Sequence, residues 1–146
     1  MPASVLIVPL GRTRRTAWLK RSMKTIARWN DGKFVKLAGR SDEQFLDELL
    51  RRLETQLAGI DQTKPVIAAI HHLPFAQLLP PRSARWDFAK AYLGSGRIGE
   101  LLLKHPNVRM SISGHSHFPA DVMVDHIHAV NIGSGYRKKV FRMFEV

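Results

Sequence analysis

The sequence contains no cysteine among its 146 residues. Disulfide bonds and thiolate metal ligands are therefore excluded, and a metal ion could be held only by histidine, carboxylate, amide or main-chain groups. No apolar run approaches the ~20 residues that a membrane-spanning helix needs. Basic residues follow the first apolar stretch instead of preceding it, which is the wrong order for a secretory signal. These features predict a cytoplasmic protein without a membrane span.

Acidic residues are scarce, because 12 Asp and Glu stand against 23 Lys and Arg, for a formal net charge of +11. The basic residues are concentrated at 12–24 and again at 137–139. Such an excess suits either a solvated basic surface or a surface that binds nucleic acid or other phosphates. A further explanation is that the balancing carboxylates lie on a segment that this chain lacks. Nucleic acid is therefore a candidate partner.

The hydrophobic pattern predicts a single α/β domain over residues 1–146, with a mixed sheet and flanking helices. The clearest helix is capped by Ser41, which forms a capping box with Gln44, and it ends at Gly59. Other helices are expected at 18–29 and 97–105, and strands at 5–10, 66–72, 108–113, 121–124, 127–132 and 140–146. The segment 34–39 fits either a short strand or a connection.

Histidines follow two of the predicted strands. His71 and His72 come after "VIAAI", and His115 and His117 come after "VRMSIS" and Gly114. Ligands of open α/β sheets bind at the carboxyl ends of the strands, so these histidines should meet at one edge. The glycine would let the main chain turn sharply before His115. Histidines that converge in a chain without cysteine predict a metal site. The remaining histidines, at 105, 126 and 128, are more simply interpreted as structural.

Three stretches, "VIAAIHHLPF", "SISGHSH" and "VNIGSGY", resemble in this order the C-terminal half of the calcineurin-like metallophosphoesterase superfamily. The likeness extends over residues 60–146. It implies the second half of an αββα sandwich, two divalent metal ions (Mn, Fe or Zn) and hydrolysis of a phosphomonoester or phosphodiester. His71 and His115 would bind one ion and His117 the other. His72 fits the His-x-Pro spacing of the family motif and is the alternative to His71.

The early motifs of that family are absent from this chain. We find no Asp-x-His near the N-terminus, no Gly-Asp-x-x-Asp and no Gly-Asn-His followed by Asp or Glu. The resemblance therefore implies a family member without its first half, which lacks the bridging carboxylate and has no catalytic residue of its own. Divalent ions need about four or more ligands. We expect the isolated chain to be inactive unless a partner chain carries the missing half.

The long irregular segment 73–96 would lie beside the mouth of such a site. Its candidate contacts with a phosphorylated substrate are Arg82, Arg85 and Trp86, because arginine clamps phosphate and an aromatic ring can cover a base or sugar. The simpler interpretation is a surface loop anchored by Trp86 and Phe88. Two other functions remain open: a basic module that binds nucleic acid or phosphate and has structural histidines, and a degenerate scaffold that keeps the fold for association.

Overall fold

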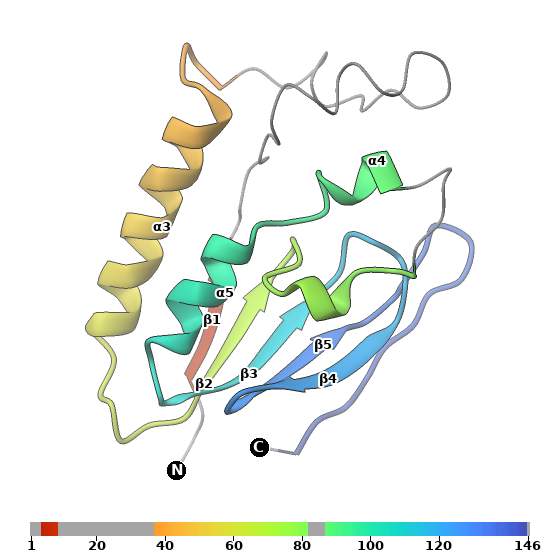
Figure 1. Ribbon diagram of the computed structural model, residues 1–146. Coiled ribbons are helices and arrows are strands. Elements are labelled where there is room, and N and C mark those ends of the chain that lie inside the picture. Colours follow the sequence, from red (N-terminus) through yellow and green to blue (C-terminus); the bar gives the residue numbers. More distant parts are fainter. Residues whose placement is uncertain (1–3, 9–36, 82–86, 146) are drawn as a thin grey trace.

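The computed structural model describes residues 4–8, 37–81 and 87–145. In these residues five strands form one mixed sheet in the order β1-β2-β3-β5-β4 (Figure 1). The strands are β1 (Ser4–Val8), β2 (Val66–Ile70), β3 (Val108–Ser113), β4 (Ala120–Val124) and β5 (Ile127–Asn131). All neighbours pair in parallel except β4 and β5, which are antiparallel. The α/β class with a mixed sheet, predicted from the sequence, is confirmed.

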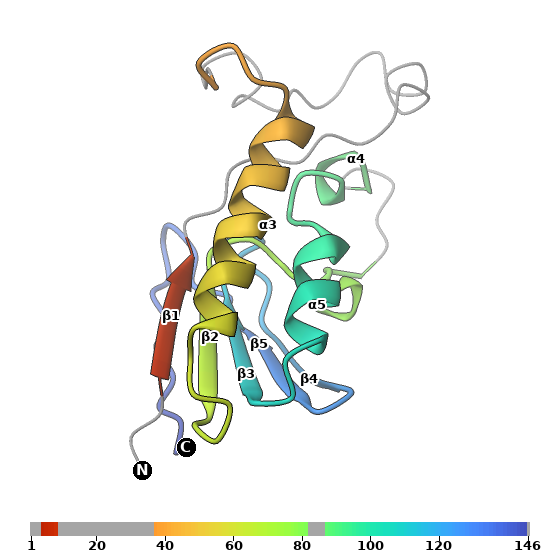
Figure 2. The same cartoon turned by 90° about the vertical axis from the view of Figure 1, so that its left-hand side faces the viewer.

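Two helices, α3 (Asp42–Ala58) and α5 (Gly96–Leu103), lie on the same face of the sheet (Figure 2). The predicted capping box of α3 is present: Gln44 N donates to Ser41 Oγ at 3.1 Å and Ser41 N donates to Gln44 Oε1 at 2.9 Å. Two short helices, η1 (Ala76–Leu78) and α4 (Asp87–Lys90), interrupt the connection from β2 to α5. The predicted helix at 18–29 lies outside the described residues. None of the described helices is long and apolar enough to cross a membrane.

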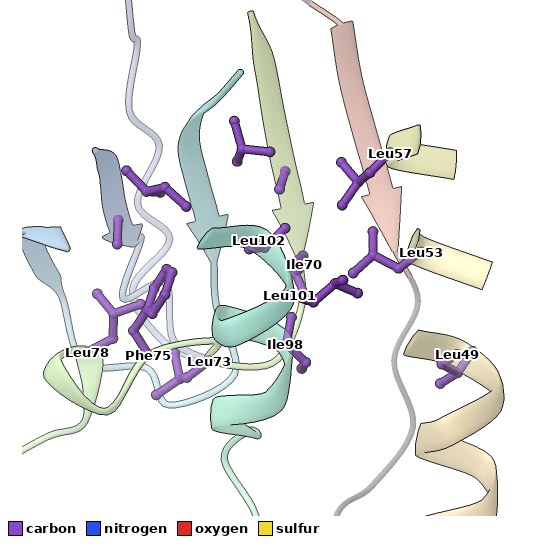
Figure 3. Packing of buried hydrophobic residues seen from close by; sticks show 14 of the residues in the cluster. Leu49, Leu53, Leu57, Ile70, Leu73, Phe75, Leu78, Ile98, Leu101 and Leu102 are labelled. Carbon is purple, nitrogen blue, oxygen red and sulfur yellow. The ribbon is translucent and has the colours of Figure 1, made fainter. Parts of the chain in front are cut away.

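The main core fills the space between the sheet and these helices (Figure 3). Residues of α3 recur at helical spacing, and alternate residues of β2 and β5 belong to the same core on the helix-covered side of the sheet. The core members include Leu46, Leu49, Leu53, Leu57, Val66, Ala68, Ile70, Ile98, Leu102, Ile127 and Ala129. At Gly99 an added Cβ would lie 2.5 Å from Pro74 O, so α5 packs directly on the segment that follows β2. This packing holds the carboxyl end of β2, where His71 and His72 lie.

The C-terminal segment does not form the strand that was predicted at 140–146. Its described residues, 140–145, form no strand, and β4 is the last strand at this side of the sheet. The segment lies instead on the face away from α3 and α5 (Figure 2), where Arg142 Nη1 donates to Asp121 Oδ2 at 2.8 Å and the Phe144 ring contacts His128. Val140 and Phe144 are partly buried in this segment, whereas Phe141 and Met143 stay exposed.

Candidate functional site

The carboxyl ends of β2 and β3 lie side by side, because these strands pair in parallel. Gly114 N donates to His71 O at 3.2 Å, which ties the two strand ends together directly. His71 and His72 leave the end of β2, and His115 leaves the end of β3 one residue after Gly114. The three histidines therefore gather at the carboxyl edge of the sheet, as the parallel-strand argument predicted.

The closest contact in this group is a hydrogen bond between His71 Nε2 and His115 Nδ1 at 3.0 Å, and the tautomers of the two rings decide which nitrogen donates. The centroid of the His72 ring lies 4.5 Å from that of His115 and 5.3 Å from that of His71. In a tetrahedral complex, two imidazole nitrogens at the usual ~2.0–2.1 Å from a zinc ion lie about 3.3 Å from each other. The His71–His115 pair is therefore within a few tenths of an ångström of the spacing of two ligands of one ion.

His71 and His72 differ in their exposure. The first is exposed, whereas the second is 9% exposed and counts among the buried polar residues. Successive residues of an extended chain point to opposite sides, and this accounts for the difference. Both rings still contact His115. His71 and His72 thus both remain candidates for the metal ligand from this strand. The short nitrogen–nitrogen distance to His115 is observed for His71.

His117 turns to a different neighbour. Its ring packs edge-on against Tyr136, with 4.7 Å between the ring centroids, and it is exposed. Within residues 4–8, 37–81 and 87–145, no group of three or more His, Asp or Glu side chains is arranged to hold a metal ion. The described residues thus fit part of a metal centre: two imidazoles at ligand spacing with a third ring in contact, and no carboxylate to complete the set.

The backbone of the histidine loop, residues 114–118, adopts the left-handed conformation at two non-glycine residues. His115 has φ 62° and His117 has φ 56°. This conformation costs an L-residue about 1–2 kcal/mol, and it persists only where the surroundings enforce it. The expectation that Gly114 would provide the sharp turn is wrong. Its φ is not positive, and an added Cβ would meet only His71 Nδ1, at an ordinary 3.8 Å.

Asn131, the last residue of β5, holds this loop in place. Its side chain is wholly buried, and its Nδ2 donates to Ser116 Oγ at 2.6 Å and also to Phe118 O. Ser113 Oγ donates to Val130 O at 3.1 Å, which adds a link between β3 and β5. The sequence argument included Asn131 only as part of a family-like stretch and missed this role. The available signal was a polar residue at the end of the apolar strand "IHAVN".

The other histidines make structural contacts. His126 Nε2 lies 3.3 Å from His105 O, and His128 Nε2 lies 2.6 Å from Asp121 Oδ1. The hydrogen bond from His128, followed by the Arg142 guanidinium, holds the pKa of Asp121 below its ordinary value. The first contact joins the β4–β5 turn to the end of α5, and the others join β4, β5 and the C-terminal segment, away from the histidine pair.

The three candidate substrate contacts, Arg82, Arg85 and Trp86, lie outside the described residues. Their proposed role in a substrate loop stays a prediction.

No protein-family model matches this chain, and no curated protein matches it. A solved structure is similar in fold: phosphopantetheinyl hydrolase from Mycobacterium tuberculosis, with a TM-score of 0.61 and 15% sequence identity. The likeness covers 72% of this chain and 36% of that protein, so the chain spans about a third of that protein's length. At this identity the likeness concerns the fold.

Proposed function

We propose that this chain supplies the histidine ligands of a metal-dependent phosphoesterase site. The observation that carries the proposal is the 3.0 Å distance between His71 Nε2 and His115 Nδ1 at the ends of adjacent parallel strands. The similarity in fold to a hydrolase supports the same class of activity. His117 would serve a second ion, and His72 is the alternative ligand to His71. The substrate would be a phosphomonoester or a phosphodiester.

Divalent Mn, Fe or Zn at such a site would lower the pKa of a bound water and polarise a phosphoryl oxygen. The chain would contribute imidazole nitrogens as ligands. Uncharged ligands do not offset the positive charge of the ion, so the ion would keep its effect on the bound water. Asn131 fixes the loop that carries His115, so this donor is held before any ion arrives. The carboxylates that would complete the centre are not grouped with these histidines in the described residues. We propose that a partner chain or another segment supplies them.

Metal binding tests the proposal directly. Titration of the chain with Mn²⁺, followed by electron paramagnetic resonance, should show a site that His115→Ala weakens about tenfold or more. His71→Ala should have a similar effect. The matched control is His126→Ala, since His126 contacts His105 O and lies in the turn just before β5, at the opposite end of the sheet. Equal Mn²⁺ binding by all of these variants would contradict the proposal.

Activity provides the second test. We expect the chain alone to hydrolyse little p-nitrophenyl phosphate or bis-p-nitrophenyl phosphate with Mn²⁺ present, because its ligand set is incomplete. A polypeptide that carries the missing carboxylates should restore turnover, and His117→Ala should abolish the restored activity. Turnover by the isolated chain at ~1–10³ s⁻¹, as is usual for enzymes, would refute the incomplete-site argument. DNA binding that depends on salt but not on a chelator, without Mn²⁺ binding, would favour the alternative of a phosphate-binding module.

A further inference from the structure

A second loop lies at the same end of the sheet as the histidines. This loop, residues 133–139, follows β5 (Figure 1), and Ile132 N just before it donates to Ser113 O at 2.9 Å. Gly133 has φ 74°, and an added Cβ would lie 2.5 Å from Pro119 N. Only glycine accommodates both the conformation and the approach. The loop is therefore packed closely against the segment that follows the histidine loop.

The loop 133–139 is compact and contacts His117, one of the predicted metal ligands. Gly135 N donates to Lys138 O at 2.9 Å, and Val140 N donates to Ser134 Oγ at 3.2 Å, so the turn is closed by its own hydrogen bonds. Tyr136 packs its ring edge-on against His117. Tyr136 itself is 87% exposed, so the close packing of Gly133 on Pro119 is what places the following residues near the histidine loop.

The residues that follow Tyr136 are three consecutive cations, Arg137, Lys138 and Lys139, all exposed. None of them forms an ion pair within the part of the chain that the structure describes. Nearby Arg142 shows the contrast, because it is neutralised by Asp121. Three adjacent like charges repel each other, and the arrangement becomes favourable when an anion with several charges binds to it.

We propose that the loop 133–139 binds the remote phosphate groups of a substrate that carries several phosphates. This inference rests on the proposed function, since it places the reacting phosphate at the histidines and the remaining phosphates at Arg137, Lys138 and Lys139. A ligand with one phosphate would leave the loop unused. The substrate class is therefore a polyphosphate or another phosphoanhydride.

Isothermal titration calorimetry with inorganic tripolyphosphate and with orthophosphate, both in the presence of a chelator, tests this inference. We expect tripolyphosphate to bind the wild-type chain and orthophosphate to bind much more weakly. Each exposed cation that faces a phosphate contributes up to about fivefold in affinity. The triple variant Arg137→Ala, Lys138→Ala, Lys139→Ala should therefore bind tripolyphosphate about 10- to 100-fold more weakly.

A charge-matched variant controls for the general loss of positive charge. Arg51→Ala, Lys104→Ala and Arg109→Ala together remove three exposed cations from α3, the end of α5 and the start of β3. This variant should bind tripolyphosphate within about twofold of the wild type, since these residues lie far from the loop 133–139. Thermal unfolding of both variants shows whether the fold is retained.

Two outcomes would overturn the inference: equal losses in the triple variant and its control, or tighter binding of single-stranded DNA than of tripolyphosphate by the wild type. The chelator separates this test from the metal test. Tripolyphosphate binding that depends on the loop, with no Mn²⁺ binding, would refute the proposed function alone. Mn²⁺ binding through His115, with no loop-dependent tripolyphosphate binding, would refute the inference alone.

Discussion

The left-handed conformation of His115 leads to a prediction about stability. An L-residue at φ 62° is strained by about 1–2 kcal/mol, and glycine removes this strain. Glycine also gives the unfolded chain more freedom, which costs about 0.5–1 kcal/mol relative to alanine. Both His115→Gly and His115→Ala delete the imidazole, so their difference isolates the backbone. We expect His115→Gly to exceed His115→Ala in free energy of unfolding by about 0.5–1 kcal/mol, or a few degrees in Tm.

Ser116 provides a control within the same loop, because its φ is not positive. Ser116→Gly and Ser116→Ala both lose the hydroxyl that accepts from Asn131, and only the glycine entropy then distinguishes them. Ser116→Gly should therefore be less stable than Ser116→Ala, which is the opposite sign to His115. Urea unfolding followed by far-ultraviolet circular dichroism measures both differences. The same sign at the two positions would show that the strain argument for His115 is wrong.

Two further predictions concern residues that hold the strands and loops together. Asp121→Asn should lower the free energy of unfolding at pH 7 by up to about 1 kcal/mol, because Asp121 is half-exposed and solvent screens its contact with His128. The pKa of Asp121 is lowered from 3.8, so the contribution of Asp121 to the free energy of unfolding is present above pH 3.8 and is lost as the pH falls through the lowered pKa. Urea unfolding of the wild type and of Asp121→Asn over a pH series measures this. A stability difference between the two proteins that stays unchanged at the acid end of the series would contradict the prediction. Asn131→Ala should lower the free energy of unfolding by about 1–3 kcal/mol, since it removes the donor to Ser116 and Phe118. The same variant should weaken Mn²⁺ binding in an electron paramagnetic resonance titration, because Asn131 holds the histidine loop. Unchanged Mn²⁺ affinity would show that the position of His115 does not depend on Asn131.

Local patterns accounted for most of the fold. The capping box of α3 and the bounds of β3 are encoded by adjacent residues, and the structure agrees with both. The meeting of His71 and His115 was also predictable, because it needs only parallel strands that end at a common edge. These features depend on short stretches of sequence and on general rules of sheet geometry.

The parts that failed depend on contacts between distant segments. The edge-on contact of His117 with Tyr136 and the hydrogen bond from Asn131 to Ser116 were not predicted from the sequence. A strand was predicted at 140–146, but its described residues contact β4 and β5 only through side chains such as Arg142 and Phe144. A single stretch of sequence shows neither which distant residue contacts a loop nor whether a segment pairs with the sheet.

The pairing of β2 with β3 has a consequence for the order of folding. His71 and His115 are 44 residues apart, and closing a loop of that length costs roughly 3 kcal/mol in chain entropy. The helix α3 and the β4–β5 hairpin need only local contacts, so we expect them to form first and the histidine pair to form late. A metal ion that recognises only the assembled pair would then slow unfolding while leaving the folding rate nearly unchanged. A bound metal ion would thus stabilise the assembled sheet mainly by lowering its rate of unfolding.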